Sequence, residues 1–329
     1  TYTLGLIITA LTGEQPSAYL RPRLLDPLGI PQRWWRPLPS ERAAEAADLA
    51  QEQAFSGFHL TVDDVNRLTI ALAEGGRWNG EQIIPAAYVQ AMAQPWSDNR
   101  DPAAPTLEDG EPDPGQLDWA LGYGYQVWRS IHGFRLDGAY GQFGLVIPER
   151  GITLSYQGAT TNTQATLAAF WELVDSFVDG EVPTDAETSA ELALAVAGLD
   201  SWTARPALSE APENAIDVTG WELAEAEGGW RLTLPSGTDQ PWGTIAVGEG
   251  TWSSSTLLTS GSQVLHIAAQ GEHLPDGAAN LLLVDLTSPH RIVLRRESDG
   301  SLRASWSTVP LWRPELATLT VPTWVTTID

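Results

Sequence analysis

Apolar positions in the first half of the chain recur at helical spacing, separated by residues that start or stop helices. Residues 4–12 are apolar and are followed by Gly13, which is typical of a helix C-cap. Thr61 is a good N-cap, and Asp63 and Asp64 after it suit the positive end of a helix dipole. Further helices are predicted over residues 17–25, 85–92 and 163–177, and a tight hairpin turn at residues 79–80.

The pattern changes to short extended runs from residue 121. Strands are predicted over residues 123–128, 141–147 and 152–157, with residues 148–151 as a connecting turn. Residues 98–116 are rich in Pro, Asp, Glu and Gly and predict a surface loop. The first half is therefore expected to consist of helices packed on an antiparallel sheet.

The second half has the pattern of an all-β domain. Short strands are predicted over residues 230–234, 263–268, 281–286 and 291–296, and Gly, Pro, Asn and Asp separate them. An acidic segment that contains Pro and Gly, residues 179–185, lies before this domain, and residues 187–199 after it can form a short connecting helix. The predicted fold class is α+β, with a first domain over 1–178, a linker over 179–200 and a barrel-like β domain over 201–329.

Composition excludes several classes of function. The net charge of −24 argues against nucleic acid and against anionic membrane surfaces as partners, because both attract clustered Lys and Arg. The chain has no Cys, which excludes disulfides, thiolate catalysis and Cys-based zinc sites. All 18 basic residues are Arg, so a Ser–Lys catalytic pair cannot be built from this sequence alone.

Other candidate chemistry is weak. Ser56 lies close to His59, yet no Gly-x-Ser-x-Gly elbow accompanies it, and we interpret it as a turn serine. Thr1 could act as an N-terminal nucleophile only at the start of a strand, whereas the segment after it is predicted as a helix. The five histidines lack metal-ligand spacing, and no metal or organic cofactor is expected.

A run of small residues, 137–142 (DGAYGQ), precedes one predicted strand. Gly138 and Gly141 would let a ligand approach the backbone and leave main-chain N–H groups accessible. Rigid N–H donors of this kind can form an oxyanion hole, although a glycine-rich strand start is also typical of a simple bulge.

Six segments together resemble the β-lactamase-related serine hydrolases, a family that includes class C β-lactamases, penicillin-binding proteins, esterases and 6-aminohexanoate-dimer hydrolases. They keep the family's order along the chain: residues 2–13, 24–31, 56–64, 76–85 (GRWNGEQIIP), 121–125 and 147–149. The resemblance covers roughly residues 1–177. A vaguer one extends over residues 200–329, whose tryptophans, such as Trp221, Trp230, Trp242 and Trp252, we interpret mainly as core residues.

The resemblance implies acyl transfer through a covalent acyl-serine. In the family, the serine belongs to a Ser-x-x-Lys motif, a Tyr-x-Asn motif manages protons, and a strand motif such as Lys-Thr-Gly lines the site. Residues 136–138 (LDG) stand at the strand motif, so the resemblance assigns Ala139 N–H as an oxyanion donor. Because no Lys stands there, the usual anchor for a β-lactam carboxylate is absent, and an esterase, amidase or peptidase is as good an expectation as a β-lactamase.

The remaining site residues are expected to bind a small-molecule substrate. Asp137, Gly138, Tyr140 and Gln142 are assigned from the strand motif, and Phe58 and Tyr123, with Tyr140, are expected as pocket walls. Ser-x-x-Lys and Tyr-x-Asn are missing from the sequence, so they are expected from a segment before Thr1 or from a separate chain, and this chain alone should be inactive. The alternative is a catalytically inactive module of the same fold that binds a ligand or peptide.

Overall fold

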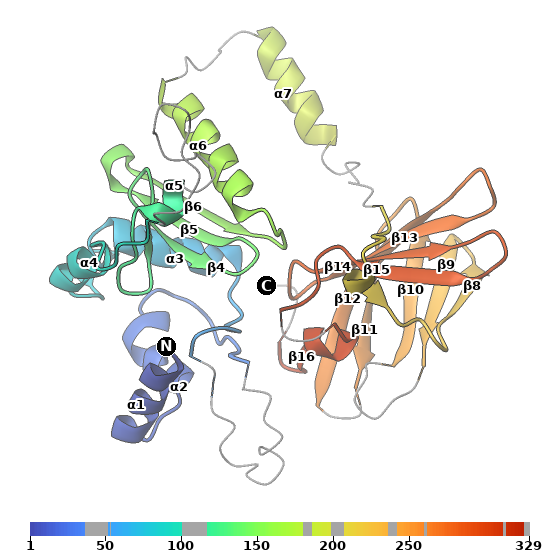
Figure 1. Cartoon of the computed structure of the whole chain (residues 1–329), viewed down its shortest axis with the longest axis horizontal. Helices are drawn as coiled ribbons and strands as arrows, with labels where there is room; N and C mark the ends of the chain where they lie inside the picture. The colour runs from blue at the N-terminus through green and yellow to red at the C-terminus, as the bar shows by residue number, and fades with distance from the viewer. Residues whose placement is uncertain are drawn as a thin grey trace. The chain divides into compact units, whose positions relative to one another are not determined.

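The computed structural model describes residues 1–36, 52, 54–100, 117–179, 186–198, 207–235, 242–259, 262–311 and 314–325. The chain divides into two compact units, Thr1–Trp171 and Glu172–Asp329 (Figure 1). Residues 101–116 of the predicted loop, and residues 180–185 and 199–200 of the predicted linker, lie outside the described part.

Apart from α5 (Leu117–Ala120), which was not predicted, the helices of the first unit begin and end close to the predicted places. They are α1 (Tyr2–Thr12), α2 (Pro16–Leu20) with a π-helical turn (Arg21–Leu25), α3 (Val62–Ala73), α4 (Ala86–Met92), α5 (Leu117–Ala120) and α6 (Thr163–Asp179), which crosses the boundary between the units. Gly13 ends α1 with a φ of 73°, and its N–H donates to Thr9 O, so the predicted C-cap is confirmed. A left-handed cap of this kind favours glycine, which has no Cβ to clash.

Helix α3 starts with a complete capping box. The Thr61 side chain accepts from the backbone of Asp64, and the Asp64 carboxylate accepts from the backbone of Thr61. Arg33 Nε also donates to Asp64 Oδ2, at 2.6 Å. Asp64 is therefore a buried anchor between a helix start and a preceding segment, a role that its sequence position alone did not indicate.

A four-stranded antiparallel sheet forms the centre of the first unit, in the order β3–β4–β5–β6. Its strands are β3 (Trp128–Arg129), β4 (Phe134–Gly138), β5 (Gln142–Ile147) and β6 (Ile152–Gln157). A separate hairpin pairs β1 (Arg77–Trp78) with β2 (Glu81–Gln82), and positive φ angles at Asn79 and Gly80 confirm the predicted tight turn.

The predicted strand over residues 123–128 is wrong. Tyr123 instead forms isolated bridges with Ser97 and Trp128, so the chain doubles back within six residues. A φ of 64° at Gln126 makes this reversal, which no alternation of apolar residues reveals. Strand β4 was not predicted, because Arg135 and Asp137 in its centre give it a polar pattern.

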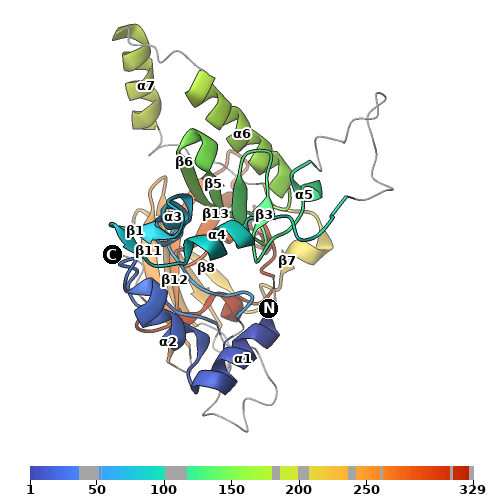
Figure 2. The same ribbon diagram turned by 90° about the vertical axis from the view of Figure 1, so that its left-hand side faces the viewer.

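Helices cover both faces of this sheet (Figures 1 and 2). On one face, α3 packs so closely that a Cβ added to Gly144 of β5 would meet Thr69 Cγ2 at 2.6 Å. On the other face, Phe170 of α6 contacts the rings of Phe143 and Tyr156 edge to face. The sheet therefore lies between α3 and α6, and alternate residues of β4 face different helices.

The second unit holds α7 (Ala186–Gly198) and a large curled mixed sheet. Its strands are β7 (Ala215–Ile216), β8 (Glu222–Ala226), β9 (Gly229–Leu234), β10 (Gly243–Glu249), β11 (Ser253–Leu258), β12 (Gln263–His273), β13 (Ala279–Asp285), β14 (Arg291–Arg296), β15 (Leu302–Trp306) and β16 (Val321–Pro322). The order β7–β15–β14–β13–β12–β10–β9–β8 runs between two ends, β11 and β16 pair with β12, and the β10–β12 pairing is parallel. The expected all-β, barrel-like domain is thus observed as a curled mixed sheet.

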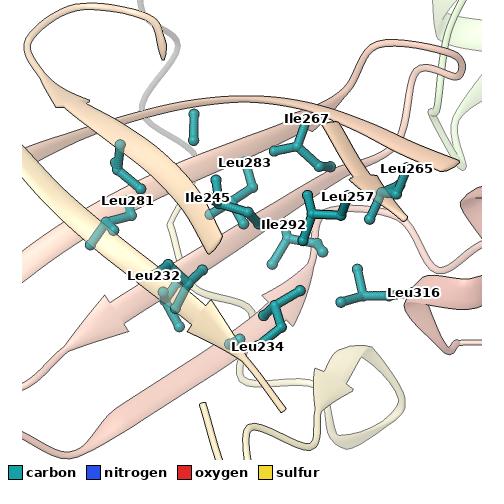
Figure 3. Close-up of a cluster of buried hydrophobic side chains, with 14 of the residues drawn as sticks. Leu232, Leu234, Ile245, Leu257, Leu265, Ile267, Leu281, Leu283, Ile292 and Leu316 are labelled. Carbon is teal, nitrogen blue, oxygen red and sulfur yellow. The ribbon is translucent and has the colours of Figure 1, made fainter. Parts of the chain in front are cut away.

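One face of that sheet forms a continuous apolar core (Figure 3). Strand β13 alternates buried and half-buried residues along its whole length, as a strand with one buried face should. Trp230 and Trp306 are buried in this core, in agreement with the structural interpretation of the tryptophans, whereas Trp242 and Trp252 are about half exposed.

Candidate active site

A cavity of about 440 Å³ lies in the first unit at the turn between β4 and β5. Four of the residues expected in the site line it: Asp137, Gly138, Ala139 and Tyr140. The other lining residues come from α5 and from the segment that leads into α6: Trp119, Thr160, Thr161 and Thr163. Residues from three separated parts of the sequence therefore meet at one concave surface.

The β4–β5 turn holds its backbone in a defined conformation. Gly141 N–H donates to Gly138 O at 3.2 Å, and of the two residues between them only Tyr140 has a positive φ, of 65°. This is the arrangement of a type II turn, in which a residue other than Gly or Asn at the third position is strained. Tyr140 O accepts from Thr160 N–H at 3.1 Å, which ties the turn to the segment before α6.

The N–H of Ala139 is available to a ligand. Within the described residues it donates to no recorded acceptor, and Ala139 lines the cavity and is exposed. A backbone donor at the second position of a rigid turn is the kind of group that can stabilise an oxyanion.

The protein's own side chains lie close to both glycines of the turn. A Cβ on Gly138 would lie 3.0 Å from Gln142 Cβ, and a Cβ on Gly141 would lie 3.3 Å from Thr160 Cγ2. Gly141 also has a φ of 83°, which disfavours other residues. The protein's own side chains thus approach both glycines closely, and Gly138 also lines the cavity.

The Gln142 side chain holds the turn through hydrogen bonds. Its side-chain amide donates to Ala139 O at 3.2 Å and to Gly158 O. Gln142 does not line the cavity, so its contacts fix the turn and the end of β6 rather than a ligand.

A buried ion network lies behind Asp137. Arg135 is fully buried, and its Nε donates to Asp137 Oδ2 at 2.7 Å. Its Nη1 lies 3.8 Å from Asp118 Oδ1 and donates to Ser130 Oγ and Arg129 O. The Trp119 ring lies over the guanidinium at 4.5 Å. Because β4 places residues 135 and 137 on the same face, one Arg neutralises a carboxylate that faces the cavity.

The surroundings change how these groups titrate. Burial raises the pKa of the Asp137 carboxyl, the Arg135 guanidinium opposes that rise, and the Asp118 carboxylate adds to it. Burial, together with the negative charge of Asp137, also raises the pKa of the Tyr123 hydroxyl. Desolvation thus raises the pKa of both groups, and the charge of Asp137 adds to the rise at Tyr123; shifted groups of this kind are common at functional sites.

The other two expected wall residues do not line this cavity. Phe58 stacks on Trp35 and packs against a separate apolar cluster that includes Leu25 and Leu28. Tyr123 contacts Trp128 edge to face, and the charge of Asp137 contributes to the raised pKa of its hydroxyl. Trp119 and the three threonines were missed, because no local pattern links them to the β4–β5 turn.

The weaker candidates have other roles. Ser56 O accepts from the Trp35 indole, and Thr1 precedes a helix, α1, rather than a strand. His266 contacts Thr256 Oγ1 at 3.0 Å, and His290 Nδ1 contacts Thr308 O at 3.0 Å. Among the described residues, no group of three or more His, Asp or Glu could hold a metal ion, and no helix has the length and apolarity to cross a membrane.

Comparison with known proteins gives one family match. The family model described as Beta-lactamase matches residues 1–173. One solved structure, described as "Putative 6-aminohexanoate-dimer hydrolase from Bacillus anthracis", shares 19% sequence identity with a TM-score of 0.39. The match covers 54% of this chain and 42% of that one, and a likeness of this size does not establish a shared fold. A search of curated proteins finds no match.

Proposed function

The chain belongs to the β-lactamase family, and on that premise we propose that it forms part of a serine hydrolase that transfers acyl groups from esters, amides or lactams. A serine hydroxyl attacks the acyl carbon, and the carbonyl oxygen becomes an oxyanion. Collapse of this intermediate breaks the bond to the leaving alcohol or amine, which takes up the proton, and water then releases the acid from the acyl-serine.

The observation that carries the proposal is the cavity at the β4–β5 turn. Its lining includes the positions that correspond to the family's strand motif, and an N–H group at Ala139 has no recorded acceptor in the described part of the chain. In the proposal this N–H donates to the oxyanion. Its rigid turn supports that role, because a donor that is already oriented loses little entropy in the transition state.

The proposed nucleophile comes from polypeptide that precedes Thr1 or from a separate chain. The sequence contains no Lys, so the Ser-x-x-Lys motif of the family must be supplied from outside it.

Labelling with a fluorophosphonate probe and a fluorescent penicillin tests the proposal. We expect one serine of the full-length polypeptide to be labelled by at least one of the two probes, in a Ser-x-x-Lys sequence before Thr1, and peptide mapping by mass spectrometry would locate it. The 329-residue chain by itself is the matched control and should remain unlabelled. A full-length protein that neither probe labels, but that still binds small acyl compounds, would replace the enzyme with a binding module of the same fold.

A further inference from the structure

Among the described residues, only one oxygen of the Asp137 carboxylate receives a hydrogen bond. Its side chain is 5% exposed and lines the cavity. Arg135 Nε donates to Oδ2, whereas Oδ1 accepts no hydrogen bond from any residue in the described ranges. Because Oδ1 has no donor from the described residues and is not enclosed by the protein, a ligand in the cavity can supply one.

In the neighbouring Asp118 carboxylate, both oxygens accept hydrogen bonds. Asp118 Oδ1 accepts from Ile131 N–H, and Asp118 Oδ2 accepts from the side chains of Gln164 and Trp171. The two carboxylates share one buried guanidinium, Arg135, so the network carries one net negative charge when both are ionised. The oxygen that faces the cavity without a partner belongs to Asp137.

The remaining walls suit a positive charge. None of the described residues that line the cavity is Arg or His, and two of them, Trp119 and Tyr140, are aromatic. Aromatic faces attract ammonium groups through their quadrupole. A substrate carboxylate would instead meet Asp137, and the Arg135 guanidinium paired with Asp137 is buried and does not line the cavity.

The start of α6 favours a negative charge nearby, whereas Asp137 favours a positive one. Asn162 Oδ1 accepts from Ala165 N–H, which places the N-terminus of this long helix at Thr163, another residue of the cavity wall. The positive end of the helix dipole favours a partial negative charge nearby, as does Ala139 N–H. Asp137 and Ala139 are two residues apart in the chain, so their Cα atoms lie within roughly 8 Å of each other.

We propose that Asp137 determines specificity, and that the cavity binds acyl substrates that carry a protonated amino group within a few bonds of the acyl carbon. The ammonium group binds to Asp137 Oδ1, and the acyl oxygen lies toward Ala139 N–H. The choice of acyl compounds rests on the proposed function, whereas the binding of an ammonium group does not.

Binding of three small probes to the 329-residue chain tests the ammonium site directly. n-Butylammonium, butyrate and butan-1-ol have similar size and differ in charge. We expect n-butylammonium to shift the backbone amide resonances of Gly138 and Ala139 in a saturable way in ¹H–¹⁵N NMR spectra. Butyrate and butan-1-ol should bind at least tenfold more weakly.

Two variants distinguish the effect of the Asp137 charge on binding from the effect of the net charge of the chain. Asp137→Asn keeps an oxygen for Arg135 Nε but removes the charge, and it should weaken n-butylammonium binding at least tenfold. Asp63→Asn removes one exposed carboxylate on α3 and should leave binding unchanged. Equal binding of butyrate and n-butylammonium, or wild-type affinity in Asp137→Asn, would overturn the proposal.

A pH titration of the unmodified chain covers the case in which Asp137→Asn does not fold. Arg135, Asp118 and Tyr123 are the charged or titratable groups that interact with Asp137. Arg135 stays protonated and Tyr123 stays neutral in acid, so n-butylammonium affinity should fall as the pH drops and the carboxylates take up protons. Affinity that is constant down to the pH at which the chain unfolds would contradict the proposal.

Hydrolysis by the full-length polypeptide distinguishes this inference from the proposed function. 4-Aminobutyryl p-nitroanilide carries an ammonium group, and its N-acetylated form carries a neutral amide in the same place. A preference of at least tenfold in kcat/KM for the free amine, lost in Asp137→Asn mainly through KM, is expected. Hydrolysis of both compounds at equal rates would reject the specificity and keep the hydrolase, whereas ammonium binding without serine labelling would keep the site and reject the reaction.

Discussion

Ala139 occupies the one turn position where an N–H can be removed without loss of the fold. It is the second residue of the type II turn that closes β4 and β5, and its φ is not positive. Proline is favoured at this position, and the residue before it, Gly138, is the last residue of a strand, a conformation that proline tolerates.

Ala139→Pro should therefore abolish the donor and preserve the turn. If this N–H stabilises the oxyanion, kcat of the full-length protein should fall by about 10²–10³, as for other oxyanion donors. Ala139→Ser retains the N–H and serves as the control, with an unchanged kcat. Steady-state kinetics with a chromogenic ester measure both. A proline variant with wild-type kcat and native circular dichroism would remove Ala139 from the mechanism.

At the scale of an element, α3 shows how a helix start connects distant segments. Asp64 belongs to the capping box and also pairs with Arg33, 31 residues earlier. Burial alone would raise the pKa of its carboxyl, but hydrogen bonds from Arg33 and Thr61 outweigh burial and hold it below the usual value. Asp63, beside it, is exposed.

Asp64→Asn should destabilise the first unit by about 2–4 kcal/mol at pH 7, because it weakens a cap and leaves Arg33 without its partner charge. Asp63→Asn is the matched control and should cost no more than about 0.5 kcal/mol. Urea unfolding monitored by helix circular dichroism measures both. A similar loss in the two variants would show that helix-dipole charge, and not the buried contact, dominates.

The wild type and Asp64→Asn should also differ in how their stability depends on pH. A carboxyl whose pKa is lowered on folding stabilises the native state above its unfolded pKa, and this contribution is lost as the pH falls through the folded pKa. The stability difference between the wild type and Asp64→Asn should therefore shrink below about pH 4.

At the scale of the whole molecule, the two units have separate apolar cores. The second core lies on one face of the curled sheet (Figure 3). In the first unit, one cluster includes Phe134 and Val146 of the four-stranded sheet, and another includes Leu25, Leu28 and Ala71. We therefore expect each unit to unfold as a cooperative unit of its own.

A pair of neighbouring leucines on β11 tests this independence. Leu257 is 2% exposed in the second core, whereas Leu258 is 54% exposed. Leu257→Ala should destabilise the second unit by about 2–5 kcal/mol, and Leu258→Ala by about 0.5 kcal/mol or less. Hydrogen exchange read by mass spectrometry should show faster exchange over β9–β14 in Leu257→Ala, with α3 and β5 unchanged. Equal loss of protection in both units would mean that they unfold together.

The sequence by itself determined the elements whose signals are local. The Gly13 C-cap, the Thr61 N-cap and the Asn79–Gly80 turn depend on residues within one or two turns of chain, so they could be predicted without knowledge of the fold. The family resemblance likewise came from ordered local motifs, and with it the expectation that residues 137–140 contribute to a site.

Only the tertiary structure decided what surrounds those residues. Arg135 and Asp137 look like exposed charges in a sequence, yet they are buried because each compensates the other and because Asp118, 17 residues before Arg135, shares the guanidinium. Trp119 and Thr163 meet Ala139 at one cavity because α5 and α6 pack beside the β4–β5 turn, whereas Phe58 packs elsewhere. Burial and charge compensation are sums over residues that are distant in sequence, and no local pattern contains them.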